Sequence, residues 1–189
     1  MTQDSVLQLL NNHTTHFPVE QAFISEMTSF VRDHDNFYQR SNLEGHITGS
    51  AWILSPNLDS MLLIHHRKLG IWFQPGGHVD LADQSIFATA EREALEETGL
   101  ASINMLTDRI FDIDIHQIPA RKGTQAHFHY DIRILGIAES LELNADFNEV
   151  SGIKWLNIEK ALSEEDKYKT VRRMLLKSQN IKDYIQKNS

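Results

Sequence analysis

Apolar residues at the start of the chain recur with the spacing of helices. They do so over residues 4–12 and 19–33, and Pro18 stands where the second of these helices would begin. Helices of this kind bury one face against a domain or against a second subunit. We therefore expect an N-terminal helical extension over residues 1–42, to which the sequence assigns no chemistry.

The pattern then changes to short runs typical of β-strands. Residues 47–54 and 61–65 are such runs, and the turn-rich residues 55–59 separate them, which predicts a β-hairpin. The run 71–73 leads into a glycine pair, which we expect to form a loop before the next helix. The order of elements is thus strand, glycine loop, helix.

A helical stretch follows the glycine pair over residues 85–98, and Gly99 supplies a glycine C-cap. Near the end of the chain, residues 153–156 read as a last strand, while residues 158–162 and 168–186 read as helices. We expect the main domain to span residues 43–165 and a C-terminal helix to span residues 166–189.

Two further segments alternate between apolar and polar residues with the period of strands. If they pair as a hairpin, their polar sides form one shared surface: Asp112, Asp114 and His116 on the first segment, and His127, His129, Asp131 and Arg133 on the second. Three histidines on this surface could donate to phosphate or bind metal near neutral pH. An ordinary solvated sheet face is the alternative interpretation.

Charge and composition limit the partners of the chain. Lys and Arg number 18 against 26 Asp and Glu, a formal charge of -8, so the basic surface expected of a protein that binds nucleic-acid polymers is absent. There is no cysteine, which excludes disulfides, thiolate zinc sites and cysteine nucleophiles. No apolar run approaches the roughly 18 residues of a membrane helix, and we expect a cytoplasmic protein without membrane contact.

The residues with the clearest chemistry lie in the helical stretch before Gly99. At about 100° per residue, Glu93, Glu96 and Glu97 fall on one face of the helix. Carboxylates so placed repel each other unless a cation lies between them, and oxygen ligands suit Mg²⁺ or Mn²⁺. A solvated acidic face is the alternative that the triplet alone leaves open.

The surrounding residues favour the metal site, because the whole segment resembles the Nudix box, G-x5-E-x7-R-E-U-x-E-E-x-G-U with U aliphatic. The positions that match are Gly77, Arg92, Glu93, Glu96, Glu97, Gly99 and Leu100, with Ala94 in an aliphatic slot. Asp83 replaces the early glutamate, and eight residues rather than seven separate it from Arg92. Asp83 could therefore be an N-cap of the helix or a partner of Arg92.

The resemblance extends beyond the box. Glu149 stands shortly before residues 152–156, which is a frequent late feature of Nudix proteins, and residues 68–78, 112–120 and 127–135 look like an uncharacterised bacterial Nudix subgroup. The resemblance implies an α/β fold, a Nudix-type α/β/α sandwich with a mixed β-sheet, here with helices added at both termini.

The resemblance also implies a function. The chain would be a Nudix pyrophosphohydrolase that cleaves the diphosphate bond of a small-molecule substrate, nucleoside diphosphate-linked or related, with Mg²⁺ or Mn²⁺. Gly77, Glu93, Glu96 and Glu97 would hold the metal, with Glu96 and Glu97 also counted as catalytic. Arg92 would orient a carboxylate, and Glu149 would be a ligand or the general base. Hydrolysis needs an activated water and charge neutralisation, which metals supply.

Substrate recognition depends on weaker signals. We take Arg67, His116, His127 and His129 as candidate substrate-binding residues. Helical extensions in Nudix proteins often serve dimer contacts, so a homodimer is among the expected assemblies. The rival reading is a Nudix module that senses a diphosphate without cleaving it, but such chains typically lose box glutamates, and this one keeps all three.

Overall fold

The computed structural model describes residues 1–66, 70–106, 108–120, 123–144 and 150–187. They form two compact units, each described here by itself. The first unit comprises Met1–Ser50, Gly76–Glu93 and Leu106–Ile134, and the second comprises Ala51–Pro75, Ala94–Met105 and Leu135–Ser189.

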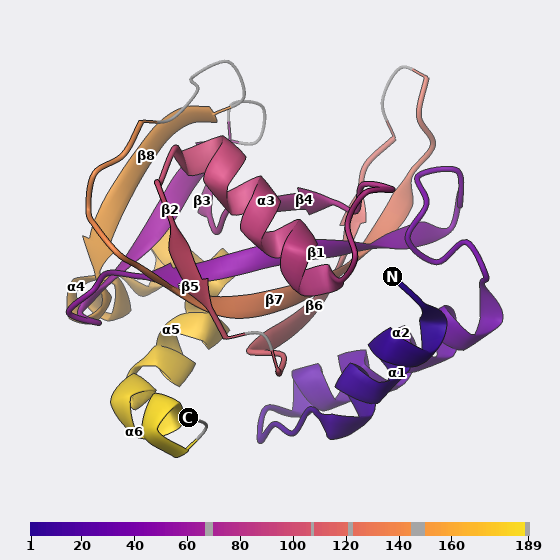
Figure 1. The fold of residues 1–189 in the computed structure, drawn as a ribbon, viewed down its shortest axis with the longest axis horizontal. Coiled ribbons are helices and arrows are strands. Elements are labelled where there is room, and N and C mark those ends of the chain that lie inside the picture. Colours follow the sequence, from indigo (N-terminus) through magenta and orange to yellow (C-terminus); the bar gives the residue numbers. More distant parts are fainter. Residues whose placement is uncertain (67–69, 107, 121–122, 145–149, 188–189) are drawn as a thin grey trace. The chain divides into compact units, whose positions relative to one another are not determined.

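The first unit begins with the two helices that the sequence predicts. Helix α1 spans Gln3–Asn12 and helix α2 spans Pro18–Asp33, and they lie side by side (Figure 1). Thr2 caps α1 because its hydroxyl accepts from the Ser5 N–H, and Pro18 occupies the first turn of α2, where its missing N–H has no helical partner to lose.

The helical extension is tied to the strands of the first unit by a buried carboxylate. Glu20 on α2 is fully buried, and it accepts from the backbone N–H of Ile113 at 3.1 Å and lies 2.9 Å from Nε2 of His13. The ring of Phe30 stacks on that of Tyr130 with centroids 4.0 Å apart. The extension therefore packs on its own domain.

The strands of the first unit bring the glycine pair against β1. Strand β1 spans Gly45–Leu54, and β4, Gly76–His78, pairs with it in antiparallel register. The glycine pair was expected in a loop, and this expectation is wrong. A Cβ on Gly76 would lie 2.3 Å from Oγ of Ser50, so only glycine lets the two backbones approach closely enough to pair.

The hairpin of two alternating strands is confirmed. Strand β6, Asp112–Ile118, pairs antiparallel with β7, His127–Ala138, and places Asp112 opposite Arg133 and Asp114 opposite Asp131. The side chain of Arg133 is buried and pairs with all three aspartates, at 3.0, 3.1 and 2.8 Å. Asp112, Asp131 and Arg133 on the polar side of the hairpin are thus buried, and for them the interpretation as a solvated sheet face is wrong.

The second unit contains the remaining strands. Strand β2, Ser60–His66, forms the predicted hairpin with β1 through Leu54 and Met61. The others are β3, β8 and β5, which span Trp72–Phe73, Val150–Asn157 and Ile103–Met105. Strands β3 and β8 each pair antiparallel with β2, and β5 pairs antiparallel with β7. The strand expected at 153–156 is thus confirmed.

The C-terminal segment differs from the single helix expected over residues 168–186. After α4, Ile158–Ser163, it breaks into a 3-10 turn at Glu165–Val171 and two short helices, α5 at Arg172–Ser178 and α6 at Ile181–Lys187. Tyr168 leaves the helical region at φ -119° and ψ 27°. Its side chain is buried and its hydroxyl accepts from Nζ of Lys154, so packing overrides the local helical pattern.

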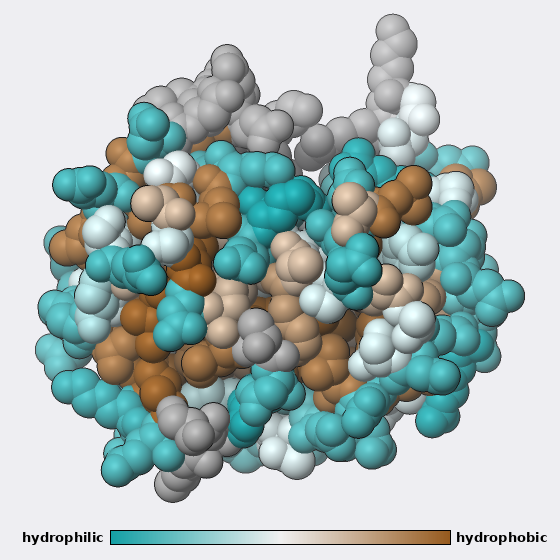
Figure 2. Space-filling model, viewed as in Figure 1, coloured by the Kyte–Doolittle hydropathy of each residue, from teal (hydrophilic) through white to brown (hydrophobic). Residues whose placement is uncertain are grey.

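Polar side chains predominate on the face of the molecule in Figure 2, and apolar residues show between them. Over the described ranges, no helix combines the length and the hydropathy that crossing a membrane requires.

We expect Glu20→Gln to lower the free energy of unfolding by about 2 kcal/mol, because the buried N–H of Ile113 and the ring of His13 lose a charged acceptor. Glu26→Gln is the matched control on the exposed side of the same helix and should change stability by less than about 0.5 kcal/mol. Urea unfolding of the two variants measures the difference, and equal midpoints would show that Glu20 does not anchor the extension.

Candidate metal and diphosphate site

The site is centred on the close approach of strand β4 to helix α3, Ile86–Thr98. A Cβ on Gly77 would lie 2.5 Å from Oε2 of Glu93, inside the space of that carboxylate. A Cβ at position 77 would displace the Glu93 carboxylate from its present position. Ser85 starts the helix, since its hydroxyl accepts from the N–H of Ala88 at 3.2 Å.

Arg92 connects the segments around this contact. Its Nη2 donates to the carbonyl of His78 at 2.9 Å, and its Nη1 donates to Oε1 of Glu93 at 3.0 Å. Its other face binds Asp83, with Nε to Oδ1 at 3.1 Å and Nη2 to Oδ2 at 2.9 Å. The hydrogen bond to Asp83 raises the pKa of Arg92, which therefore stays charged.

Asp83 is the partner of Arg92, and the N-cap alternative is wrong because Ser85 has that place. Burial by itself would raise the pKa of Asp83, but hydrogen bonds from Arg92, the Asp80 N–H and the Thr89 hydroxyl together lower it. The extra residue between Asp83 and Arg92 is thus compatible with a two-point ion pair.

The other two box glutamates follow on the same helix. Glu96 is exposed and Glu97 is half-buried. Gly99 ends the helix at φ 64° with its N–H bonded to the carbonyl of Leu95 at 2.9 Å, so the predicted glycine C-cap is confirmed. The spacing of the three glutamates along α3 puts Glu93, Glu96 and Glu97 on neighbouring positions of one helix face.

The donor set around β4 and α3 suits a hard divalent ion. It consists of carboxylate oxygens and the nearby Gly77 backbone, and the carboxylate of Glu93 lies where a side chain at Gly77 would be. Mg²⁺ and Mn²⁺ prefer such oxygen ligands. The carboxylates of the box are therefore of the chemical kind that the expected metal prefers.

The predicted histidines are brought together with two that the sequence analysis missed. We define the histidine cluster as His46, His78, His116, His127 and His129. The ring of His129 lies 4.9 to 5.5 Å, centroid to centroid, from those of the other four. The period-2 spacing of His127 and His129 on β7 predicted that these two lie on one side of a strand. No local sequence pattern relates His46 on β1 or His78 on β4 to them.

Two predicted site residues, Arg67 and Glu149, lie outside the described residues.

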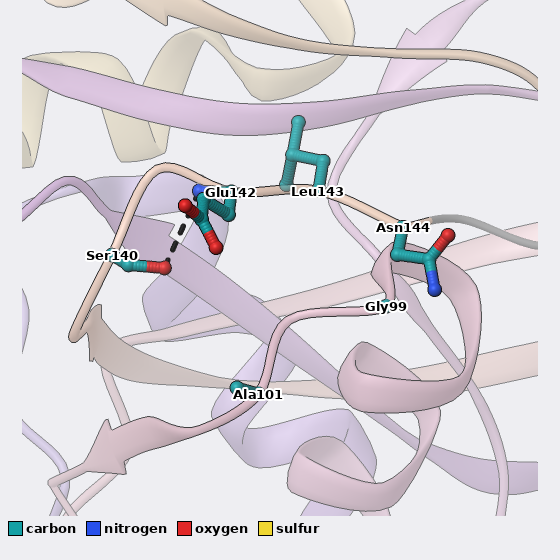
Figure 3. A pocket seen from close by; sticks show the side chains of 6 residues that line it. All are labelled: Gly99, Ala101, Ser140, Glu142, Leu143 and Asn144. Carbon is teal, nitrogen blue, oxygen red and sulfur yellow. Dashed lines mark hydrogen bonds between the residues drawn. The ribbon is translucent and has the colours of Figure 1, made fainter.

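A hollow of about 420 Å³ is lined by residues that were not predicted as site residues: Gly99, Ala101, Ser140, Glu142, Leu143 and Asn144 (Figure 3). Its single ionisable lining residue is Glu142, an anion, which gives a diphosphate no cationic partner. We therefore place the chemistry at β4 and α3.

The sequence model of the NUDIX domain matches residues 46–177, more than two thirds of the chain. The chain belongs to the Nudix family. This membership confirms the expected α/β fold class and the expected enzyme class, a Nudix pyrophosphohydrolase. No curated protein matches the chain.

Solved structures give remote similarities. A NUDIX-family hydrolase from Clostridium perfringens is 22% identical with a TM-score of 0.48, over 69% of this chain and 95% of that one. An Ap4A hydrolase from C. elegans is 18% identical with a TM-score of 0.48, over 71% and 96%. A MutT protein from Methanosarcina mazei Go1 is 19% identical with a TM-score of 0.49, over 75% and 97%.

We expect Asp83→Asn to cost about 2 kcal/mol of stability at neutral pH, because Arg92 loses its ionic partner. The folded-state pKa of Asp83 is lowered, so the contribution of its charge is full above the ordinary value of 3.8 and disappears as pH falls through the folded value. Unfolding of the variant and wild type at several pH values tests this. Asp80→Asn, in the same loop but exposed, is the control and should show no such pH-dependent gap.

Proposed function

We propose that the chain hydrolyses the diphosphate bond of a small-molecule substrate, nucleoside diphosphate-linked or related, with Mg²⁺ or Mn²⁺ held by the Gly77 carbonyl, Glu93, Glu96 and Glu97. The observation that carries the proposal is the approach of the Gly77 backbone to the Glu93 carboxylate, which a Cβ at position 77 would displace from its present position. A surface glutamate that serves only solubility needs no such approach.

Arg92 is the positioning residue of this site. Its guanidinium donates to the Glu93 carboxylate and to the His78 carbonyl together, which fixes Glu93 relative to β4. Asp83 holds the guanidinium from the opposite side in a two-point pair. A ligand carboxylate fixed in this way loses little freedom when it binds an ion.

Hydrolysis itself requires a proton acceptor. A water oxygen forms a bond to phosphorus, the bond from phosphorus to the bridging oxygen breaks, and a carboxylate takes the proton of the water. Glu149 or one of the box glutamates is our candidate for that carboxylate. When bound, the divalent ion would neutralise charge on the phosphate oxygens and acidify the water.

Substrate recognition is assigned to Arg67 and to His116, His127 and His129. Two of these histidines lie on β7 within the histidine cluster, and His116 lies opposite His129 on β6. The ring of His129 lies 5.0 Å from that of His78, the residue next to Gly77 in the chain, which supports a substrate contact with this cluster.

We expect hydrolysis of diphosphate compounds to require added Mg²⁺ or Mn²⁺, because the carboxylates of α3 bind substrate phosphate only through a cation. The measurement is phosphate or nucleotide release from a panel of diphosphate compounds, with each ion and with excess chelator. Undiminished hydrolysis in chelator would refute the metal-dependent mechanism, and binding of a compound without turnover would favour the sensor reading.

We expect Glu97→Gln to reduce kcat by about 100-fold or more while the protein stays folded, because the half-buried side chain contributes to chemistry rather than to the core. Glu91→Gln is the matched control, since position 91 is on the same helix, about 200° around it from Glu93. Steady-state kinetics and circular dichroism measure the two effects. Equal activity in both variants would remove Glu97 from the site.

A further inference from the structure

We propose that His46, His127 and His129 bind a divalent transition-metal ion of the zinc class, at a site separate from the carboxylate site of α3. One ring nitrogen from each of these three side chains can be chosen so that all lie within 4.8 Å of one another. All three belong to the first unit, on strands β1 and β7. Binding at this site does not depend on the proposed hydrolysis.

The spacing needs only small side-chain movements to close on an ion. Nitrogens bound at about 2.1 Å around a tetrahedral ion lie about 3.4 Å apart. Rotations about the side-chain bonds of His127 and His129, both only partly buried, can supply the difference.

The strongest indication is an unsatisfied buried ring. The side chain of His46 is 2% exposed, and neither Nδ1 nor Nε2 makes a hydrogen bond of good geometry. The backbone of Asn42 lies near enough to oppose the lowering of the pKa of His46. Nε2 of His129 is likewise buried without a partner. Buried polar atoms are almost always paired, so unpaired nitrogens that face each other indicate a ligand that they would share.

His127 is already set in the form that binds metal. Its Nδ1 lies 2.9 Å from the carbonyl oxygen of Gln125, which can only accept, so Nδ1 carries the proton and the lone pair is on Nε2. A backbone carbonyl that fixes the tautomer in this way is the usual partner of a metal-binding histidine.

The electrostatics favour a cation-binding site of neutral rings over an anion-binding site. Burial, aided by the nearby His127 and Arg40, lowers the pKa of His46 to about 4. Burial and the surrounding histidines lower the pKa of His129 to about 2. The lone pair of a neutral imidazole can bind a metal ion, whereas an uncharged ring attracts an anion less than a protonated ring does.

The donors also select the class of ion. Imidazole nitrogens suit Zn²⁺, Ni²⁺, Cu²⁺ and Fe²⁺, while Mg²⁺ prefers oxygen. Three histidines leave the fourth position of a tetrahedral zinc ion for water or a phosphate oxygen. His78 and His116, whose rings lie 5.0 and 5.5 Å from that of His129, line the remaining side.

The test uses untagged full-length protein that has been stripped with chelator and equilibrated with Zn²⁺ in an excess of Mg²⁺. We expect elemental analysis after desalting to find one zinc per wild-type chain and less than about a tenth of that in His46→Gln and His129→Gln. His16→Gln, the same change at an exposed histidine outside the cluster, should retain zinc fully. Glu97→Gln should also retain it, which separates this site from the proposed hydrolytic one.

X-ray absorption at the zinc edge of the wild-type protein gives a second readout that does not depend on whether the variants fold. We expect the scattering pattern of imidazole rings with nitrogens at about 2.0–2.1 Å. A shell of oxygens alone would overturn the proposal, and so would no retained zinc in the wild type. Retention of zinc by His46→Gln and His129→Gln at the wild-type level would also overturn it. So would protection against thermal unfolding by inorganic phosphate but not by Zn²⁺, which would make the cluster an anion site.

Discussion

The guanidinium of Arg92 joins three parts of the first unit: Asp83 in the loop before α3, the His78 carbonyl at the end of β4, and Glu93 on α3. A planar group with five donors can bind all of them at once, and lysine could not. The bond of Arg92 to Glu93 holds that carboxylate beside the bare backbone of Gly77. The metal site that we propose therefore depends on this arginine and on the small size of the residue at position 77.

A second buried network fixes the strand on which β4 docks. Asp131 accepts from the hydroxyls of Thr48 and Ser50 on β1, at 3.0 and 2.7 Å, while Arg133 neutralises it from the same strand. Ser50 is also the residue that would meet any side chain at Gly76. The buried charges thus connect β7 to β1, and β1 to the glycine strand. Such networks are costly unless fully satisfied, which makes the arrangement specific.

Strand β4 links the two kinds of chemistry in the first unit. Gly77 lies against the carboxylate of Glu93, and the next residue, His78, has its ring 5.0 Å from those of His46 and His129. The carboxylate and the histidine sites that we propose thus each lie beside one of two consecutive residues of β4. A diphosphate, with oxygens that bind either kind of ion, would suit such a pair of sites.

The sequence by itself determined the hairpins, helix α3 with its glycine end, and the box residues, because periodicity, turn residues and helix caps act over a few residues. It left Asp83 between two roles, since an N-cap and an ion pair use the same carboxylate and only the fold brings Arg92 to it. The sequence predicted which residues form the polar side of β6 and β7, but not that part of this side is buried. The sequence analysis also missed His46 and His78, because pairing of distant strands leaves no local pattern. The expected start of the C-terminal helix at residue 168 was wrong because a tertiary contact holds Tyr168 outside the helical region. Helix propensity, worth only a fraction of a kcal/mol per residue, is too weak to prevent this.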